Sequence, residues 1–171
     1  MTQWSLLTLV GEDRPGIVAA VSRALFEGGC HLAEASMMRL GGNFAIMLRV
    51  AHAKDSDLKG LLFPVCQSLG LHLHIDVDIP ATAPVVEPDV QVTVYGVDRP
   101  GIVAQVTGVL AEAGLNIVDL ETAVGGSEDN PIYIMTIEGV AEKGVERLEE
   151  AVASLDEGIK VKVTSIETMR G

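Results

Sequence analysis

The chain repeats one segment of its own sequence 85 positions later. Residues 5–29 align without a gap with residues 90–114, and 13 of these 25 positions are identical. The most similar part reads GEDRPGIVAAV at Gly11 and GVDRPGIVAQV at Gly96. This period is too long for one unit of a solenoid and fits one small domain. The sequence therefore predicts two copies of the same domain.

A proline-rich stretch separates the two copies. It reads PATAPVVEPD and carries Pro80, Pro84 and Pro88. Proline lacks the backbone donor that helices and sheets use, and it keeps the preceding residue extended. We therefore predict an extended linker over residues 81–88, with a first domain over 1–80 and a second over 89–171.

The first half of each copy changes from the period of a strand to that of a helix. Residues 5–10 and 90–97 have the apolar or alternating pattern of strands. The following segments carry an apolar residue at every fourth position, which indicates one helix face: Ile17, Val21, Leu25 and Ile102, Val106, Leu110. We expect the proline of each DRPG segment in the first helical turn, and the glycines at 28–29 and 114 at the helix ends.

The second half of each copy reads strand, strand, helix, strand. The expected strands cover 31–40, 44–50 and 71–79 in the first copy and 116–124, 132–139 and 159–164 in the second. Gly41-Gly42-Asn43 predicts a tight hairpin, and GGSEDNP predicts a longer turn in the second copy. Second helices are expected around 57–69 and 142–155. Four methionines, Met37, Met38, Met47 and Met135, are expected to fill the core.

Both copies therefore have the order βαββαβ. With right-handed crossovers, this order gives an antiparallel sheet with two helices on one face, a ferredoxin-like α+β unit. The other face of the sheet stays uncovered, so we expect it to meet the sister domain or another chain.

Charge and composition narrow the classes of function. The formal net charge is −12, of which residues 1–80 contribute −2 and residues 81–171 contribute −10. Binding to a phosphate backbone needs clustered Lys and Arg, so we predict no direct contact with nucleic acid. The sequence shows neither a signal peptide nor an apolar run of membrane-spanning length. Cys30 and Cys66 are isolated, which fits a reducing, cytoplasmic location.

The DRPG segments carry the chemistry of a small zwitterion site. We expect Gly11 and Gly96 to adopt backbone angles that other residues avoid, and the glycine of each Pro-Gly pair to let a ligand approach the backbone. The amides of residues 16–18 at a helix start favour a carboxylate. Asp13 or Asp98 can hold an ammonium group. The alternative is that Asp13 only caps the helix, and both interpretations stay open.

Each DRPG segment is part of a longer signature that resembles that of the ACT domain, a small-molecule sensing module of βαββαβ topology. It consists of a strand, G-x-DRPG-I, an apolar helix, a glycine, and then His31-Leu32 or Asn116-Ile117 at the start of the second strand. A chain of two such domains is similar to the glycine cleavage system transcriptional repressor family. The resemblance implies a cytoplasmic regulator that binds a small amino acid, glycine first, and acts on a transcription factor by protein contact.

The resemblance also implies where the ligand binds. In related domains it lies at an interface between two modules, against the helix-start turn and the residue that opens the second strand. In this sequence the corresponding ligand-binding residues are Asp13, Arg14, Gly16, Ile17, His31, Asp98, Arg99, Gly101, Ile102 and Asn116. Asn116 offers both a donor and an acceptor, whereas His31 stands where the family often has Asn. One working site or two both remain open.

Other functions find less support in the sequence. We predict no enzyme, cofactor or metal, because no GxSxG elbow, phosphate loop or assigned base for a cysteine is present. His72 and His74 share a strand face, yet no spacing supplies further metal ligands. The remaining alternatives are a ligand-independent interaction or homodimerisation module and a detached regulatory subunit of an amino-acid enzyme.

Overall fold

The structure, a computed structural model, describes residues 1–167 of the chain. It divides into two compact units, Met1–Ala83 and Pro84–Gly171, each with its own sheet and core. No helix within the described residues is long and apolar enough to span a bilayer.

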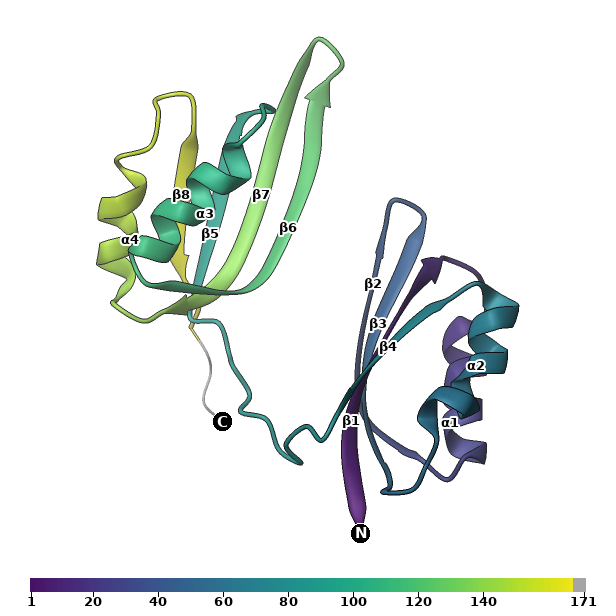
Figure 1. The fold of residues 1–171 in the computed structure, drawn as a ribbon. Helices are drawn as coiled ribbons and strands as arrows, with labels where there is room; N and C mark the ends of the chain where they lie inside the picture. The colour runs from purple at the N-terminus through teal and green to yellow at the C-terminus, as the bar shows by residue number, and fades with distance from the viewer. Residues whose placement is uncertain (168–171) are drawn as a thin grey trace. The chain divides into compact units, whose positions relative to one another are not determined.

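The first unit is a four-stranded antiparallel sheet with two helices on one face (Figure 1). Its elements are β1 (Thr2–Glu12), α1 (Ile17–Glu27), β2 (His31–Leu40), β3 (Asn43–Ala53), α2 (Leu58–Leu69) and β4 (His72–Val77). The strands lie in the order β2-β3-β1-β4, so β2 and β4 are the edges.

The second unit repeats this architecture. Its elements are β5 (Val90–Val97), α3 (Ile102–Glu112), β6 (Leu115–Ser127), β7 (Asn130–Ala141), α4 (Val145–Val152) and β8 (Lys160–Ser165). The strand order β6-β7-β5-β8 is that of the first unit. The predicted α+β fold of two βαββαβ domains is confirmed.

The core of each unit lies between the sheet and the helices. Alternate residues of the central strand point to the helices, so Leu7 and Leu9 are fully buried in the first unit. The predicted apolar helix face is confirmed in both units, because its six residues are buried: Ile17, Val21, Leu25, Ile102, Val106 and Leu110. Burial of a side chain of this size contributes about 1.5–3 kcal/mol each, so these faces fix the helices to the sheets.

The first hairpin has the predicted tight turn. Leu40 pairs with Asn43, and Gly41 and Gly42 between them have φ of 57° and 79°. Two positive φ values in a two-residue loop match the twist of the flanking strands.

The second hairpin differs from its prediction. Ser127 pairs with Asn130, so its turn is also two residues, Glu128 and Asp129. The expected longer turn is wrong because β6 and β7 extend further instead, with Gly125 inside β6.

The last helix is shorter than the expected 142–155. α4 begins after Gly144, whose φ of 90° and ψ of 156° are not helical. Glu142 therefore lies outside the helix, in the turn before it.

The methionine prediction holds for one residue of four. Met135 is fully buried, whereas Met37, Met38 and Met47 are about half exposed. Met47 pairs with Thr8 and Met38 with Ala45 on the sheet face that carries no helix. Met37 belongs to the edge strand β2, where no further strand covers it.

Candidate functional site

Each DRPG segment forms a tight turn ahead of its helix. Gly16 has φ 86° and ψ 2°, and Gly101 has φ 88° and ψ −2°. The amide of Ile102 donates to the carbonyl of Arg99 at 3.4 Å. Proline followed by glycine with these angles makes a type II β-turn. The prediction that the prolines lie in the first helical turn is wrong, because the helices begin after the glycines, at Ile17 and Ile102.

Gly11 and Gly96 have another role than the one predicted. Both lie within strands and neither has a positive φ. A Cβ on Gly11 would lie 3.0 Å from the carbonyl oxygen of Gly70 and 2.8 Å from the Leu71 side chain. Glycine is needed here because the loop before β4 passes close to the end of β1.

The starts of α1 and α3 have no side-chain cap. In the capping alternative Asp13 accepts a backbone N–H there, but neither helix has a side-chain cap hydrogen bond, and Gly16 and Gly101 stand at the N-cap. The capping alternative is therefore wrong. The first amides of a helix have no partner within it, so the N–H groups of the first turn remain available to an anion, apart from that of Ile102, which donates to Arg99.

Asp13 binds a cation within its own domain. Its carboxylate lies 2.6 Å from the Arg39 guanidinium, and its amide donates to the Gly42 carbonyl at 3.0 Å. Arg39 shares a row with Phe44 and Gly11. The matching row of the second domain is Gly96, Tyr133 and Val124. Asp98 is exposed, and an apolar residue takes the place of Arg39 in its domain.

The two corner arginines have different partners. Arg14 pairs with Glu12 at 3.1 Å. Arg99 donates to Gln105 Oε1 at 3.0 Å and to Asp156 Oδ2 at 2.8 Å, and Gln105 Nε2 donates to the same carboxylate oxygen at 3.2 Å. Hydrogen bonds from Gln105 and Arg99 lower the pKa of Asp156. The second corner is thus connected to α3 and to the loop before β8.

A cavity of about 330 Å³ opens at the first corner. Its walls include Asp13, Gly16, Ile17 and the edge residue Met37. Nothing lies within 4 Å of the position that a Cβ on Gly16 or Gly101 would take. The first corner therefore has a cavity on the scale of a small ligand, and the second corner is open beside Gly101.

His31 and Asn116 lie far from the corners of their own domains. His31 opens β2, whereas Asp13 follows the end of β1 and contacts Arg39 near the other end of β2. At about 3.3 Å per residue, the ends of β2 are about 30 Å apart. Asn116 stands at the corresponding end of β6. Each corner can therefore share a ligand with such a residue only if a second module supplies it.

Sequence reasoning missed three residues that contact the corners: Arg39, Gln105 and Asp156. The contact of Arg39 with Asp13 depends on the strand register. A sequence shows which residues of adjacent strands lie side by side only after the hairpin register has been determined. Asp156 lies 57 positions from Arg99, and no local pattern joins them.

Other chemistry is sparse among residues 1–167. No group of three His, Cys, Asp or Glu residues there could hold a metal ion. His74 Nε2 lies 3.1 Å from its neighbour Asp76. Burial raises the pKa of the Cys30 and Cys66 thiols, which keeps both protonated and weakly nucleophilic at neutral pH.

Known families and sequences match both domains. Two family models, each described as the ACT domain, match residues 3–76 and 90–157. UPF0237 protein MMP0657 of Methanococcus maripaludis is 39% identical over 75 residues, which cover 44% of this chain and 82% of that protein. UPF0237 protein MK1213 of Methanopyrus kandleri is 38% identical over 73 residues, covering 43% and 81%.

Solved structures extend the likeness to the whole chain. A protein of unknown function from Galdieria sulphuraria has a TM-score of 0.77 at 27% identity, covering 98% of this chain and 100% of that one. A candidate glycine cleavage system transcriptional repressor has a TM-score of 0.75 at 20% identity, covering 98% and 99%. At 20% identity, the similarity to this second structure shows a shared fold and nothing further.

Proposed function

Because this chain belongs to the ACT domain family, as a tandem of two regulatory modules, we propose that it senses a small amino acid and acts on a transcription factor. Glycine is the first candidate effector, since the two-domain arrangement resembles the glycine cleavage repressor family. In this proposal the chain performs no catalysis and contacts no DNA itself.

The observation that carries the proposal is the shape of the Pro-Gly corner. Left-handed Gly16 and Gly101 each precede an uncapped helix start with open space beside it. Helix amides bind a carboxylate, and an aspartate beside them binds the ammonium group of the same zwitterion. An amino acid with a small side chain satisfies both groups.

The second corner is the better candidate for the working site. Asp13 is already neutralised by Arg39, whereas Val124 occupies the equivalent register position of the second domain. An incoming ammonium would therefore displace a cation at the first corner and find a free-standing carboxylate at the second. We assign the binding of the effector to Asp98, Gly101 and Ile102. The residue at the start of the second strand of another module, His31 or Asn116, would complete the site.

Regulation then follows from linkage. A ligand that binds one arrangement of modules more tightly shifts the population toward it, typically by 1–3 kcal/mol in allosteric proteins. That arrangement would present a different surface to the transcription factor. The acidic second domain suits a protein partner better than a phosphate backbone.

Calorimetric titration of the full chain with each of the twenty amino acids tests the sensor. We expect glycine or a similarly small amino acid to bind, and Asp98→Asn to weaken its affinity by about tenfold, the loss of one charged hydrogen bond. Asp13→Asn is the matched control and should change the affinity little. No heat with any amino acid at millimolar concentration would contradict the sensor and leave a ligand-independent interaction module.

A second experiment addresses the transcriptional part. In a strain that lacks this chain, we expect transcripts for glycine cleavage to lose their response to added glycine. Restoring the chain should restore the response, and the Asp98→Asn variant should not. An unchanged response in the deletion strain would remove the transcriptional role.

A further inference from the structure

The edge strand β4 has a self-complementary sequence. Residues 71–79 read LHLHIDVDI, with Ile75 at the centre. His72 and His74 precede the centre, and Asp76 and Asp78 follow it at the same distances. An antiparallel partner of identical sequence, paired about Ile75, would therefore face each histidine with an aspartate and each apolar residue with an apolar one.

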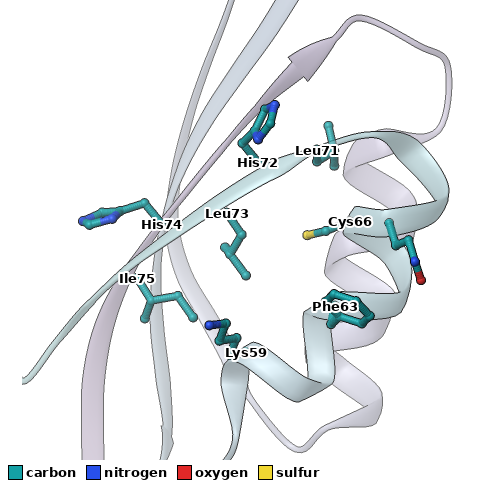
Figure 2. Close-up of a pocket in the computed structure, with 9 residues that line it drawn as sticks. Lys59, Phe63, Cys66, Leu71, His72, Leu73, His74 and Ile75 are labelled. Carbon is teal, nitrogen blue, oxygen red and sulfur yellow. The ribbon is translucent and has the colours of Figure 1, made fainter.

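The structure places the two kinds of side chain on opposite faces of β4. In the register with β1, His74 pairs with Thr8 and Asp76 with Leu6, on the face without helices. Leu73 and Ile75 point toward α2, and Figure 2 shows His74 on the other side of the strand. The alternation needed for face-matched pairing is thus present in the fold.

The outer side of β4 is open. β4 is an edge of its sheet, and a groove of about 520 Å³ runs between it and α2 (Figure 2). Leu73, Ile75 and the 57%-exposed Phe63 line this groove. Val77 is 63% exposed at the end of the strand. An edge with free backbone groups and apolar neighbours is a template for another strand.

The duplicated edge of the second domain has the opposite design. β8 carries Lys160 and Lys162 at the register positions of His72 and His74, and these lysines pair with Tyr95 and Thr93 on the open face. Two copies of β8 paired about Val163, the register counterpart of Ile75, would bring Lys162 against Thr164, with no opposite charge to meet it. Lysines on an edge are a common protection against pairing. The β8 edge of the second domain is thus protected by lysines, whereas the β4 edge of the first domain is complementary to its own copy.

We propose that two copies of this chain associate through β4, in antiparallel register about Ile75, to join their first-domain sheets into one. His74 of each copy then faces Asp76 of the other, Leu73 faces Val77, and Ile75 faces itself on the twofold axis. The paired strands end before Asp78, because its φ of 58° turns the backbone out of the strand and its carboxylate accepts a hydrogen bond from Gln3. Such an interface is isologous, as closed dimers require.

This interface is independent of the proposed effector site. The Pro-Gly corners and β2 take no part in it, so the failure of one proposal leaves the other standing. One strand and a groove make a small contact compared with stable dimers, and we therefore expect a weak association at micromolar concentrations or above.

A cross-linking experiment tests the register. Residue 75 is the only position of β4 that meets its own copy, so Ile75→Cys in the full chain should form an intermolecular disulfide under mild oxidation. The matched control is His72→Cys, which the register places about 20 Å from its equivalent at about 3.4 Å per residue. A covalent dimer from Ile75→Cys alone supports the proposal. Equal dimer from both variants, or none from either, overturns it.

A charge exchange tests the pairing chemistry without cysteine. Sedimentation equilibrium at about pH 6, where an ordinary imidazole is mostly protonated, measures the dissociation constant. His74→Asp sets like charges opposite each other twice and should weaken the dimer about tenfold, while the double variant His74→Asp with Asp76→His restores opposite charges and the affinity. Lys162→Ala on β8 is the control and should leave the constant unchanged. A wild-type monomer at high micromolar concentration, or a dimer indifferent to His74→Asp, overturns the proposal.

Discussion

The guanidinium of Arg99 lies 2.8 Å from the carboxylate of Asp156, on the loop between α4 and β8. Gln105 donates to the same oxygen at 3.2 Å, from the first turn of α3. The second Pro-Gly corner, its helix and the last loop of the domain are therefore joined at one exposed carboxylate. The equivalent arginine of the first domain, Arg14, contacts only its close neighbour Glu12 in this way.

The first prediction concerns the pKa of Asp156. Hydrogen bonds from Gln105 and Arg99 lower it, so Gln105→Ala and Arg99→Ala should each raise it toward the ordinary value of an aspartate, about 3.9. A carboxyl with a lowered folded-state pKa adds stability above its unfolded pKa, and this is lost as pH falls through the folded value. NMR titration of the side-chain carboxyl measures the pKa. An unchanged value in both variants would contradict the contact.

The second prediction concerns the left-handed glycines. Gly16→Ala and Gly101→Ala should each lower the free energy of unfolding by about 1–2 kcal/mol, because an L residue is strained at φ near 87° even where space is open. The control is Gly108→Ala inside α3, where a Cβ meets nothing within 4 Å and helix propensity should add about 0.5–1 kcal/mol.

Denaturant unfolding can follow the two domains separately. Trp4 is the single tryptophan and reports the first domain, while both tyrosines, Tyr95 and Tyr133, lie in the second. Fluorescence should therefore detect Gly16→Ala, and near-ultraviolet circular dichroism of tyrosine should detect Gly101→Ala and Gly108→Ala. Equal effects of all three substitutions would contradict the turn geometry.

The third prediction concerns a buried histidine of the first domain. His52 is 5% exposed, with Nδ1 2.8 Å from the Ala53 carbonyl and Nε2 2.8 Å from the Ser5 hydroxyl. The carbonyl only accepts, so Nδ1 carries a proton, and in the neutral ring Nε2 accepts from the Ser5 hydroxyl. Ser5→Ala leaves a buried acceptor without its donor and should cost about 1–3 kcal/mol in unfolding free energy.

The control for this substitution is Ser22→Ala. That hydroxyl is exposed and donates to a carbonyl of its own helix, so its loss should have a small effect. Urea unfolding of both variants, followed by Trp4 fluorescence, makes the comparison. If the two variants lost equal stability, the buried pair would have no special role.

The sequence predicted the duplicated fold well, because repetition and period are local signals. The four-residue spacing from Ile17 to Leu25 predicts a helix from residues close in sequence. The Gly41-Gly42 pair predicts its turn in the same local way. The errors have a common physical cause. Gly11 is needed because Gly70 passes nearby, and Asp13 pairs with Arg39 instead of capping its helix, both through contacts between separate elements.

The candidate site was less accessible to sequence reasoning for the same reason. The corner residues follow from the DRPG motif, but Arg39 and its replacement by Val124 become meaningful only through the pairing of β2 with β3 and of β6 with β7. An identical motif therefore has different electrostatics in the two domains, and no local window of sequence shows this.

The last prediction uses that difference to exchange the properties of the two corners. Val124→Arg should place a cation beside Asp98, as Arg39 lies beside Asp13, and compete with the ammonium group of the effector. We expect about a tenfold loss of amino-acid affinity in calorimetry, the effect of one charged contact. Val124→Met is the control, because it adds length without charge and should bind nearly as the wild type does. The reverse change, Arg39→Val, frees Asp13 and should add a second binding event if its corner is otherwise competent. Unaltered affinity in Val124→Arg, with the wild-type chain binding, would show that Asp98 does not hold the ammonium group.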